Sequence, residues 1–221
     1  MKTSPWKYLL SFVSEQSVEK AGGPVAGDIE VSYVFGKYVI DGKQVNYGFG
    51  NLDTVFRKTL ERIRFGESQF RDILILGLGA GNILKIIEEE YAGAYSITGV
   101  EADSEMIRLG KKYFKLGERK GLQLREMNAE LFVKQMKESW DMILVDLFVD
   151  EQVPRFAEEI WFLQKMRESL RNGGSLLFNR LGHTDRLEQE SLLFSKKMNS
   201  VLPGSDYFYA HTNLMLHYQK K

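Results

Sequence analysis

The chain has 221 residues, of which 43% are apolar, and its 30 basic residues balance 30 acidic ones. This composition supports a folded core, and the lack of cysteine excludes disulfides, thiolate metal sites and a cysteine nucleophile. The balanced charge indicates no general attraction to nucleic acid or to an anionic membrane, and no apolar run approaches the roughly 20 residues of a membrane helix. We therefore expect a cytoplasmic protein that binds neither.

The N-terminal quarter of the chain changes its pattern twice. Residues 1–20 contain an apolar patch that predicts a short helix or an arm, and the glycine-rich residues 21–27 predict a loop. Apolar residues then alternate with polar ones over residues 28–47, and Asp41-Gly42 is a favoured hairpin turn. We expect residues 1–51 to form an arm and a small antiparallel β-meander.

The remainder, residues 52–221, alternates between strand and helix patterns. After a helix at about 52–65, apolar runs predict strands at 72–77, 95–101, 121–126, 142–147 and 175–179. Amphipathic helices separate them, including a long one from Pro154 that Gly173-Gly174 should end. Residues 207–218 read as two closing strands. The fold class is therefore α/β, with a Rossmann-like seven-stranded, mostly parallel sheet covered by helices on both faces.

The first core strand runs directly into three alternating glycines, Gly77, Gly79 and Gly81. A strand, a glycine turn and a helix bring backbone N–H groups and a helix N-terminus to one point, which suits the polar parts of a small molecule. The next strand ends in Glu101, where a ribose diol would be held. A dinucleotide fingerprint would place glycine where Asn82 stands, so the spacing favours a nucleoside with an amino-acid tail over a pyrophosphate.

Four segments together carry a resemblance to a known family. They are Gly77–Gly81, Glu101-Ala102-Asp103, Asn128-Ala129 and the strand that ends in Asp146. In these segments the chain resembles the class I S-adenosylmethionine-dependent methyltransferase superfamily, and in detail its spermidine synthase branch. The β-meander resembles the small N-terminal domain of that branch.

The resemblance implies a binding role for most of these residues and a catalytic role for one. Gly77, Gly79 and Gly81 would lie against the methionine-derived part of S-adenosylmethionine or of its decarboxylated form. Glu101, followed by Ala102, would accept hydrogen bonds from the ribose hydroxyls. The remaining two positions would hold the adenine, with Asn128 facing its amine and Ala129 behind it. Asp146 would help to deprotonate and orient an attacking amine, as an acid does there in spermidine synthases.

The chain departs from the spermidine synthase pattern at the positions that bind amines. Spermidine synthases carry an acid inside the glycine turn, where this chain has Ala80, and a second acid three residues after the catalytic one, where it has Val149 followed by Asp150. They also carry a Tyr and a Glu at the start of the helix before the first core strand. Residues 50–60 contain neither, and Asp53 is their one acid. A buried diamine needs several carboxylates, so too few remain.

Methyl transfer to a small-molecule acceptor is therefore the function that we expect first. Aminopropyl transfer from decarboxylated S-adenosylmethionine is one alternative, and a non-catalytic homodimeric protein that binds a nucleoside or serves as a scaffold is another. No cluster has metal-ligand spacing, so no metal is predicted. His183 follows the fifth strand, but a lone histidine in a loop is more often simply exposed. Residues 207–209 could line a pocket, although aromatic strand residues usually pack in a core.

Overall fold

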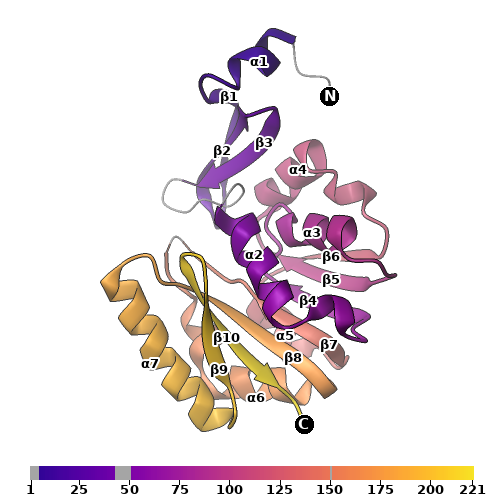
Figure 1. The fold of residues 1–221 in the computed structure, drawn as a ribbon, viewed down its shortest axis with the longest axis vertical. Coiled ribbons are helices and arrows are strands. Elements are labelled where there is room, and N and C mark those ends of the chain that lie inside the picture. Colours follow the sequence, from indigo (N-terminus) through magenta and orange to yellow (C-terminus); the bar gives the residue numbers. More distant parts are fainter. Residues whose placement is uncertain (1–4, 43–50, 150) are drawn as a thin grey trace.

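The computed structural model describes residues 5–42, 51–149 and 151–221, and it contains two sheets (Figure 1). The larger sheet has seven strands in the order β6-β5-β4-β7-β8-β10-β9. Its strands are β4 (Asp72–Leu76), β5 (Ser96–Glu101), β6 (Leu122–Glu126), β7 (Trp140–Val145), β8 (Leu170–Leu181), β9 (Asp206–Ala210) and β10 (Asn213–Gln219). The pairs among β6, β5, β4, β7 and β8 are parallel, whereas β10 runs antiparallel to both of its neighbours. The expected α/β class and mostly parallel sheet are confirmed.

The helices alternate with these strands along the chain. They are α2 (Asn51–Arg62), α3 (Asn82–Glu90), α4 (Ser104–Tyr113), α5 (Ala129–Gln135), α6 (Ile160–Glu168) and α7 (Asp185–Val201). Short 3-10 turns occupy Phe65–Glu67, Leu116–Glu118 and Arg155–Glu158. Among the described residues, no helix is long and apolar enough to cross a membrane.

Both faces of the large sheet are buried, which explains why its central strands are continuous apolar runs. Along β4, Leu74 and Leu76 pack in one core with residues of α5, α6 and α7. Ile73 and Ile75 point to the opposite face and pack in a second core with residues of α2 and α3. All four side chains are fully buried. The period-two geometry of a strand therefore divides the hydrophobic interior into two layers.

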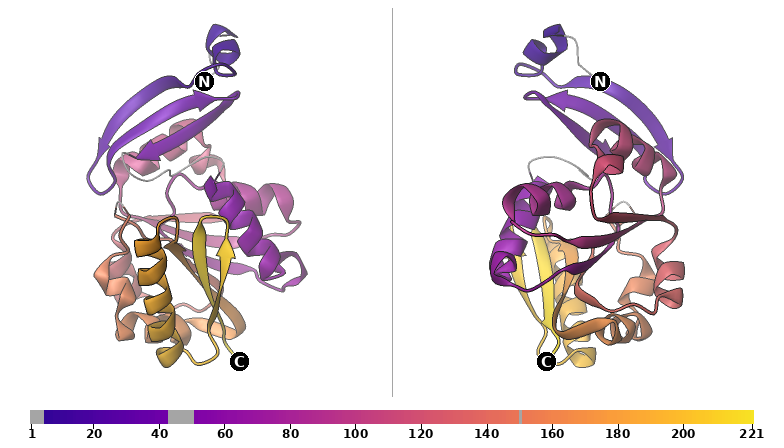
Figure 2. Two further views of the ribbon diagram at one scale, coloured as in Figure 1. Left: turned by 60° about the vertical axis from the view of Figure 1, so that its left-hand side comes forward. Right: turned by 90° about the vertical axis from the view of Figure 1, so that its right-hand side faces the viewer.

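The smaller sheet precedes the large one in the chain and is antiparallel. It consists of β1 (Gln16–Gly23), β2 (Gly27–Val34) and β3 (Lys37–Gly42), preceded by the short helix α1 (Pro5–Leu10). Ile29, Val31 and Ile40 of this sheet form a third core with Met106 and Leu109 of α4. Figure 2 shows the three strands arched beside α4, away from β9 and β10. An N-terminal antiparallel sheet is confirmed.

The strands of this small sheet differ from the predicted ones. Residues 16–23 were expected to be the end of an arm and the start of a loop, but they form β1, paired with β2 across a bulge between Ser17 and Glu19. This strand has few β-branched residues, and its pairing and its contacts with α4 hold it instead. The predicted strand at 44–47 lies outside the described residues.

The helix from Pro154 is also shorter than predicted. After a 3-10 turn, α6 ends at Glu168, and β8 begins at Leu170, so Gly173 and Gly174 lie inside a strand. They fall at an irregularity in the pairing of β7 with β8, between Trp140 and Met142. Glycine is frequent both at helix ends and at β-bulges. The glycine pair alone therefore does not distinguish the two, and the predicted helix end is wrong.

Candidate functional site

A cavity of about 620 Å³ opens at the carboxyl ends of the parallel strands. That is where open α/β sheets bind ligands, and the volume lies in the usual range for small-molecule sites, roughly 300–1,000 Å³. Strand order divides its lining into two parts. The β4–β6 side comprises residues 77–80, 82, 83, 100–103, 106 and 127–130, and the β7–β10 side comprises residues 146–149, 154, 156, 179, 181, 183, 212 and 213. Val25 and Ala26, and Leu52, Val55 and Phe56 of α2, also line the cavity, whereas Gly81 of the glycine turn does not.

The glycine turn begins immediately after β4. The backbone N–H groups of Gly77 and Leu78 both donate to the Val100 carbonyl, at 3.0 Å. Gly77 has a φ of +85°, and a Cβ there would lie 2.1 Å from the backbone oxygen of Asp146. A side chain at position 77 is thus excluded both by conformation and by the close approach of β7. The turn and Asp146 are held against each other by backbone contacts.

Glu101 ends β5 and reaches across to this turn. Its Oε2 atom accepts a hydrogen bond from the Gly79 N–H at 2.8 Å, and its Oε1 atom accepts from the N–H groups of Ala102 at 2.8 Å and Asp103 at 2.9 Å. Burial raises the pKa of Glu101, while these three N–H groups oppose that shift by favouring the carboxylate. The carboxylate is therefore fixed in orientation at the cavity wall.

Asp103 connects the β4–β6 side to the small sheet. Its Oδ1 atom caps α4 by accepting from the N–H groups of Glu105 and Met106. Its Oδ2 atom accepts from Val25 at 2.9 Å and Ala26 at 2.7 Å, in the turn between β1 and β2. Both turn residues line the cavity. One carboxylate therefore caps α4 and also holds the turn against the cavity.

Asn128 and Ala129 both line the cavity. Asn128 also caps α5, since its Oδ1 atom accepts from the N–H groups of Glu130 at 2.8 Å and Leu131 at 3.4 Å. The oxygen expected to meet an adenine amine therefore already accepts two hydrogen bonds.

Asp146 follows β7 and is the last acceptor in a series of hydrogen-bonded polar side chains, which we call the relay. Asn179 Nδ2 donates to Asp146 Oδ1 at 2.7 Å, and Asn213 Nδ2 donates to Asn179 Oδ1 at 2.8 Å. Thr212 Oγ1 donates to Asn213 Oδ1 at 3.0 Å. All four residues line the cavity. The relay fixes the carboxylate of Asp146 through its Oδ1 atom.

The environment of Asp146 makes its carboxyl a weaker acid than usual. Burial raises its pKa to about 6, the negative charge of Glu101 adds to the rise, and the hydrogen bond from Asn179 lowers it. A carboxylate with a pKa close to neutrality is suited to accept and release protons at physiological pH.

The relay residues Asn179, Asn213 and Thr212 were not singled out in the sequence. Asn179 and Asn213 come from β8 and β10, which are paired antiparallel. A detectable signal was the placement of asparagine at the end of an otherwise apolar strand, since a buried amide needs partners. Its partner could not be identified, because the two strands are joined by a helix and a further strand.

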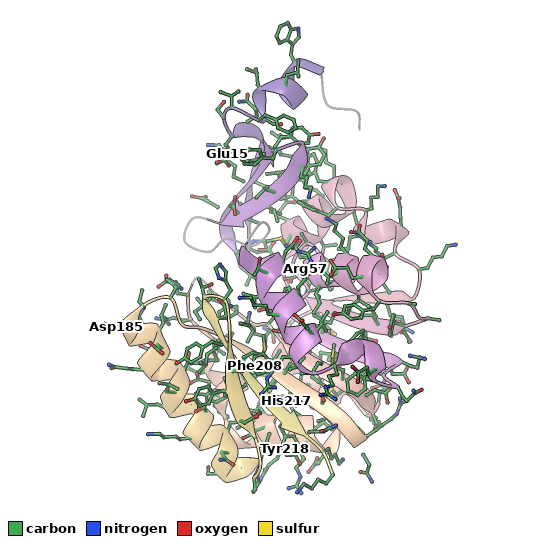
Figure 3. All side chains as sticks on the ribbon, viewed as in Figure 1. Glu15, Arg57, Asp185, Phe208, His217 and Tyr218 are labelled. Carbon is green, nitrogen blue, oxygen red and sulfur yellow. The ribbon has the colours of Figure 1, made fainter. Side chains whose placement is uncertain are left out.

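Other residues considered in the sequence lie partly at the cavity and partly elsewhere. His183 is exposed, as expected for a histidine in a loop, and it also lines the cavity and contacts Glu151 at 3.2 Å. Phe208, labelled in Figure 3, packs against the core formed with α2 and α3, while Tyr207 and Tyr209 are exposed. None of these three aromatic residues lines the cavity. Asp53 lies on α2 near Arg57 and does not line it either.

The arrangement of the sheet, the glycine turn and Glu101 defines the class I S-adenosylmethionine-dependent methyltransferase fold. A sequence model of the spermine/spermidine synthase domain matches residues 63–218, and the chain belongs to this family. The expected resemblance is confirmed.

Two curated proteins are similar to the chain over part of their length. A polyamine aminopropyltransferase of Vibrio vulnificus is 26% identical over 141 residues, which are 62% of this chain and 46% of that protein. A probable polyamine aminopropyl transferase of Bifidobacterium longum is 28% identical over 106 residues, which are 48% of this chain and 23% of that protein. The chain thus spans less than half of the length of these relatives.

Solved structures share the fold at low sequence identity. A probable spermidine synthase from Corynebacterium glutamicum superposes with a TM-score of 0.73 and 17% identity, over 92% of this chain and 79% of that one. A spermidine synthase in complex with the transition-state analogue AdoDATO gives 0.78 and 14%, over 93% and 74%. Human methyltransferase-like protein 13 in complex with SAH gives 0.58 and 18%, over 77% and 79%.

These comparisons contradict methyl transfer as the leading function. The matched family is that of spermine and spermidine synthases, and both curated relatives bear aminopropyltransferase names. The prediction of methyl transfer rests on the absence of the acids that bind amines in spermidine synthases. That inference treated a change in the acceptor pocket as a change in the reaction, although the two can vary separately.

Proposed function

We propose that the protein transfers an aminopropyl group from decarboxylated S-adenosylmethionine to an amine. The observation that carries this proposal is that Asp146, with its pKa of about 6, lines the same cavity as Glu101 and the glycine turn. Methyl transfer needs mainly positioning, whereas an amine acceptor arrives as an ammonium ion and must lose a proton. Membership of the spermine/spermidine synthase family supports the same reaction.

The residues on the β4–β6 side fit the nucleoside part of such a donor. Glu101 presents an oriented carboxylate of the kind that binds a ribose diol. A Cβ at Gly79 would meet no atom within 4 Å, so the turn leaves open space beside that carboxylate. In our proposal Gly77 and Gly79 border the sulfonium-bearing chain, Ala102 lies beside the ribose, and Asn128 and Ala129 border the adenine. Gly81 faces Leu84 and Leu116 instead, so its role is in packing the turn.

The donor supplies an electrophilic carbon next to a sulfonium sulfur. Asp146 accepts a proton from the acceptor's ammonium group and orients the resulting amine. The amine nitrogen then forms a bond to that carbon, the electron pair of the broken C–S bond goes to sulfur, and methylthioadenosine leaves. Asp146 passes the proton that it accepted to water, and the product leaves as a secondary ammonium ion. Asn179 keeps the Asp146 carboxylate in place through its hydrogen bond to Oδ1.

The test is to incubate the purified protein with decarboxylated S-adenosylmethionine and a panel of primary amines, and to follow methylthioadenosine by chromatography. Amine-dependent release is the expected result. Asp146→Asn is the matched control, because its amide oxygen can still accept from Asn179 while it cannot accept a proton from the substrate. Release of S-adenosylhomocysteine from intact S-adenosylmethionine, with no release of methylthioadenosine from the decarboxylated form, would contradict the proposal.

A further inference from the structure

The carboxylates that line the cavity differ in how many hydrogen bonds they already accept. Among the described lining residues they are Glu101, Asp103, Glu130 and Asp146. Asp103 accepts four backbone N–H groups, two on each oxygen. Glu130 is paired with Lys134 at 2.6 Å. These two are therefore engaged within the protein and are poor partners for an incoming ammonium group.

The two remaining carboxylates lie on different sides of the cavity. Glu101 belongs to the β4–β6 side and accepts three backbone N–H groups there. Asp146 is the single carboxylate on the β7–β10 side among the residues described. Asn179 engages its Oδ1 atom, and no described residue hydrogen bonds to Oδ2. This side of the cavity thus offers one carboxylate oxygen to a cation.

The surroundings of Asp146 are otherwise apolar. Six lining residues of the same side carry no polar side-chain atom: Leu147, Phe148, Val149, Pro154, Phe156 and Leu181. The amides of Asn179 and Asn213 are already bound to each other. Next to His183, the carboxylate of Glu151 is shared with Arg186. Of the residues that the structure does not describe, 1–4 and 43–50 contain no Asp or Glu, and Asp150 is the one acid.

From this distribution we propose that the acceptor carries a single amino group, held at Asp146, on an uncharged and largely apolar body. The inference rests on the proposed aminopropyl transfer and narrows its acceptor to a class. A second ammonium group placed among these apolar side chains would lose its hydration without gaining a partner, which is costly. An alkyl or aryl group at the same place gains from burial.

The decisive comparison uses two acceptors of equal size, n-pentylamine and 1,4-diaminobutane, with decarboxylated S-adenosylmethionine as donor. They differ in whether the far end is a methyl or an ammonium group. We expect kcat/KM, measured by methylthioadenosine release, to be at least about tenfold higher for n-pentylamine, because one unpaired charge is avoided. Equal values, or a preference for the diamine, would overturn the inference while leaving aminopropyl transfer intact. No release with any amine would refute the proposed function itself.

Two variants of the protein test the same preference for a single amino group. Val149→Asp places a carboxylate in the apolar part of the β7–β10 side, and Val149→Asn places a neutral group of the same size there. The expected result is that Val149→Asp shifts the ratio of the two kcat/KM values at least about tenfold toward the diamine, whereas Val149→Asn leaves it nearly unchanged. A third variant, Asp150→Asn, should keep the parental preference. Diamine activity that depends on Asp150 would contradict a single-amine acceptor.

Discussion

The two sides of the cavity are built in different ways. On the β4–β6 side, backbone N–H groups of the glycine turn and of residues 102–106 hold the carboxylates of Glu101 and Asp103. On the β7–β10 side, the side chain of Asn179 holds Asp146, and Asn179 is held in turn by the side chain of Asn213, which Thr212 contacts. A site made from backbone groups depends on the fold and accepts many sequences. A site made from side chains changes with each substitution, so we expect this side to decide which acceptor is used in the proposed reaction.

The largest difference between the two sides of the cavity is expected when Asp146 is substituted. Asp146→Asn should lower turnover by about 10²- to 10⁴-fold, the usual contribution of a general base. Nucleoside affinity, measured by calorimetric titration with methylthioadenosine, should change less than about threefold, because the β4–β6 side is untouched. A parallel loss of affinity would show that the two sides are not separate.

The same substitution should make the folded protein more stable at neutral pH. The pKa of Asp146 is raised from 3.8 to about 6, so above pH 6 the folded state pays for a buried charge that the unfolded state does not. Removing the charge should raise the free energy of unfolding by up to about 3 kcal/mol at pH 8. The gain should shrink below pH 6 and vanish below about pH 3, where Asp146 is protonated in both states. Urea unfolding at several pH values measures it, and no gain at pH 8 would contradict the buried charge.

Substitution of Asp103 tests whether its carboxylate fixes the turn of the small sheet against the β4–β6 side. Asp103→Ala leaves four backbone N–H groups without their acceptor and should cost about 2 kcal/mol of stability. Hydrogen exchange at the Val25 and Ala26 amides should become faster at the same time.

The control is Glu19→Gln, because Glu19 also joins the small sheet to α4, through Arg108, Lys112 and Tyr113. These partners hold the pKa of Glu19 down to about 2, but the contact is at the surface and should be worth less than about 1 kcal/mol. If hydrogen exchange at the Val25 and Ala26 amides is unchanged in Asp103→Ala, the Asp103 carboxylate does not hold this turn in place.

A smaller loss is expected at Glu101. Glu101→Gln keeps the size and one oxygen but removes the charge that binds N–H and hydroxyl donors, so methylthioadenosine affinity should fall about tenfold. The acceptor preference between n-pentylamine and 1,4-diaminobutane should not change. A change in that preference would mean that Glu101 also contacts the acceptor.

Much of the β4–β6 side could be predicted from the sequence because its residues stand at strand ends and helix starts, which local patterns mark. The glycine turn follows a buried strand directly, Glu101 ends the next strand, and Asp103 caps the helix that starts one residue later. Such strand–turn–helix signals need no knowledge of the rest of the chain. The alternating apolar runs likewise predicted a parallel sheet buried on both faces, since two cores require apolar residues on both sides of each strand.

The tertiary structure alone decided the rest. The relay from Thr212 to Asp146 exists because β10 pairs with β8, and the turn at Val25 and Ala26 reaches the cavity because the small sheet docks on α4. These contacts join residues 33 to 78 positions apart in the chain, and no local pattern specifies them. The sequence by itself determined the sheet, its turn and the acids at the strand ends. Which acids remain available to a substrate depends on long-range hydrogen bonds, and these form only when the chain is folded.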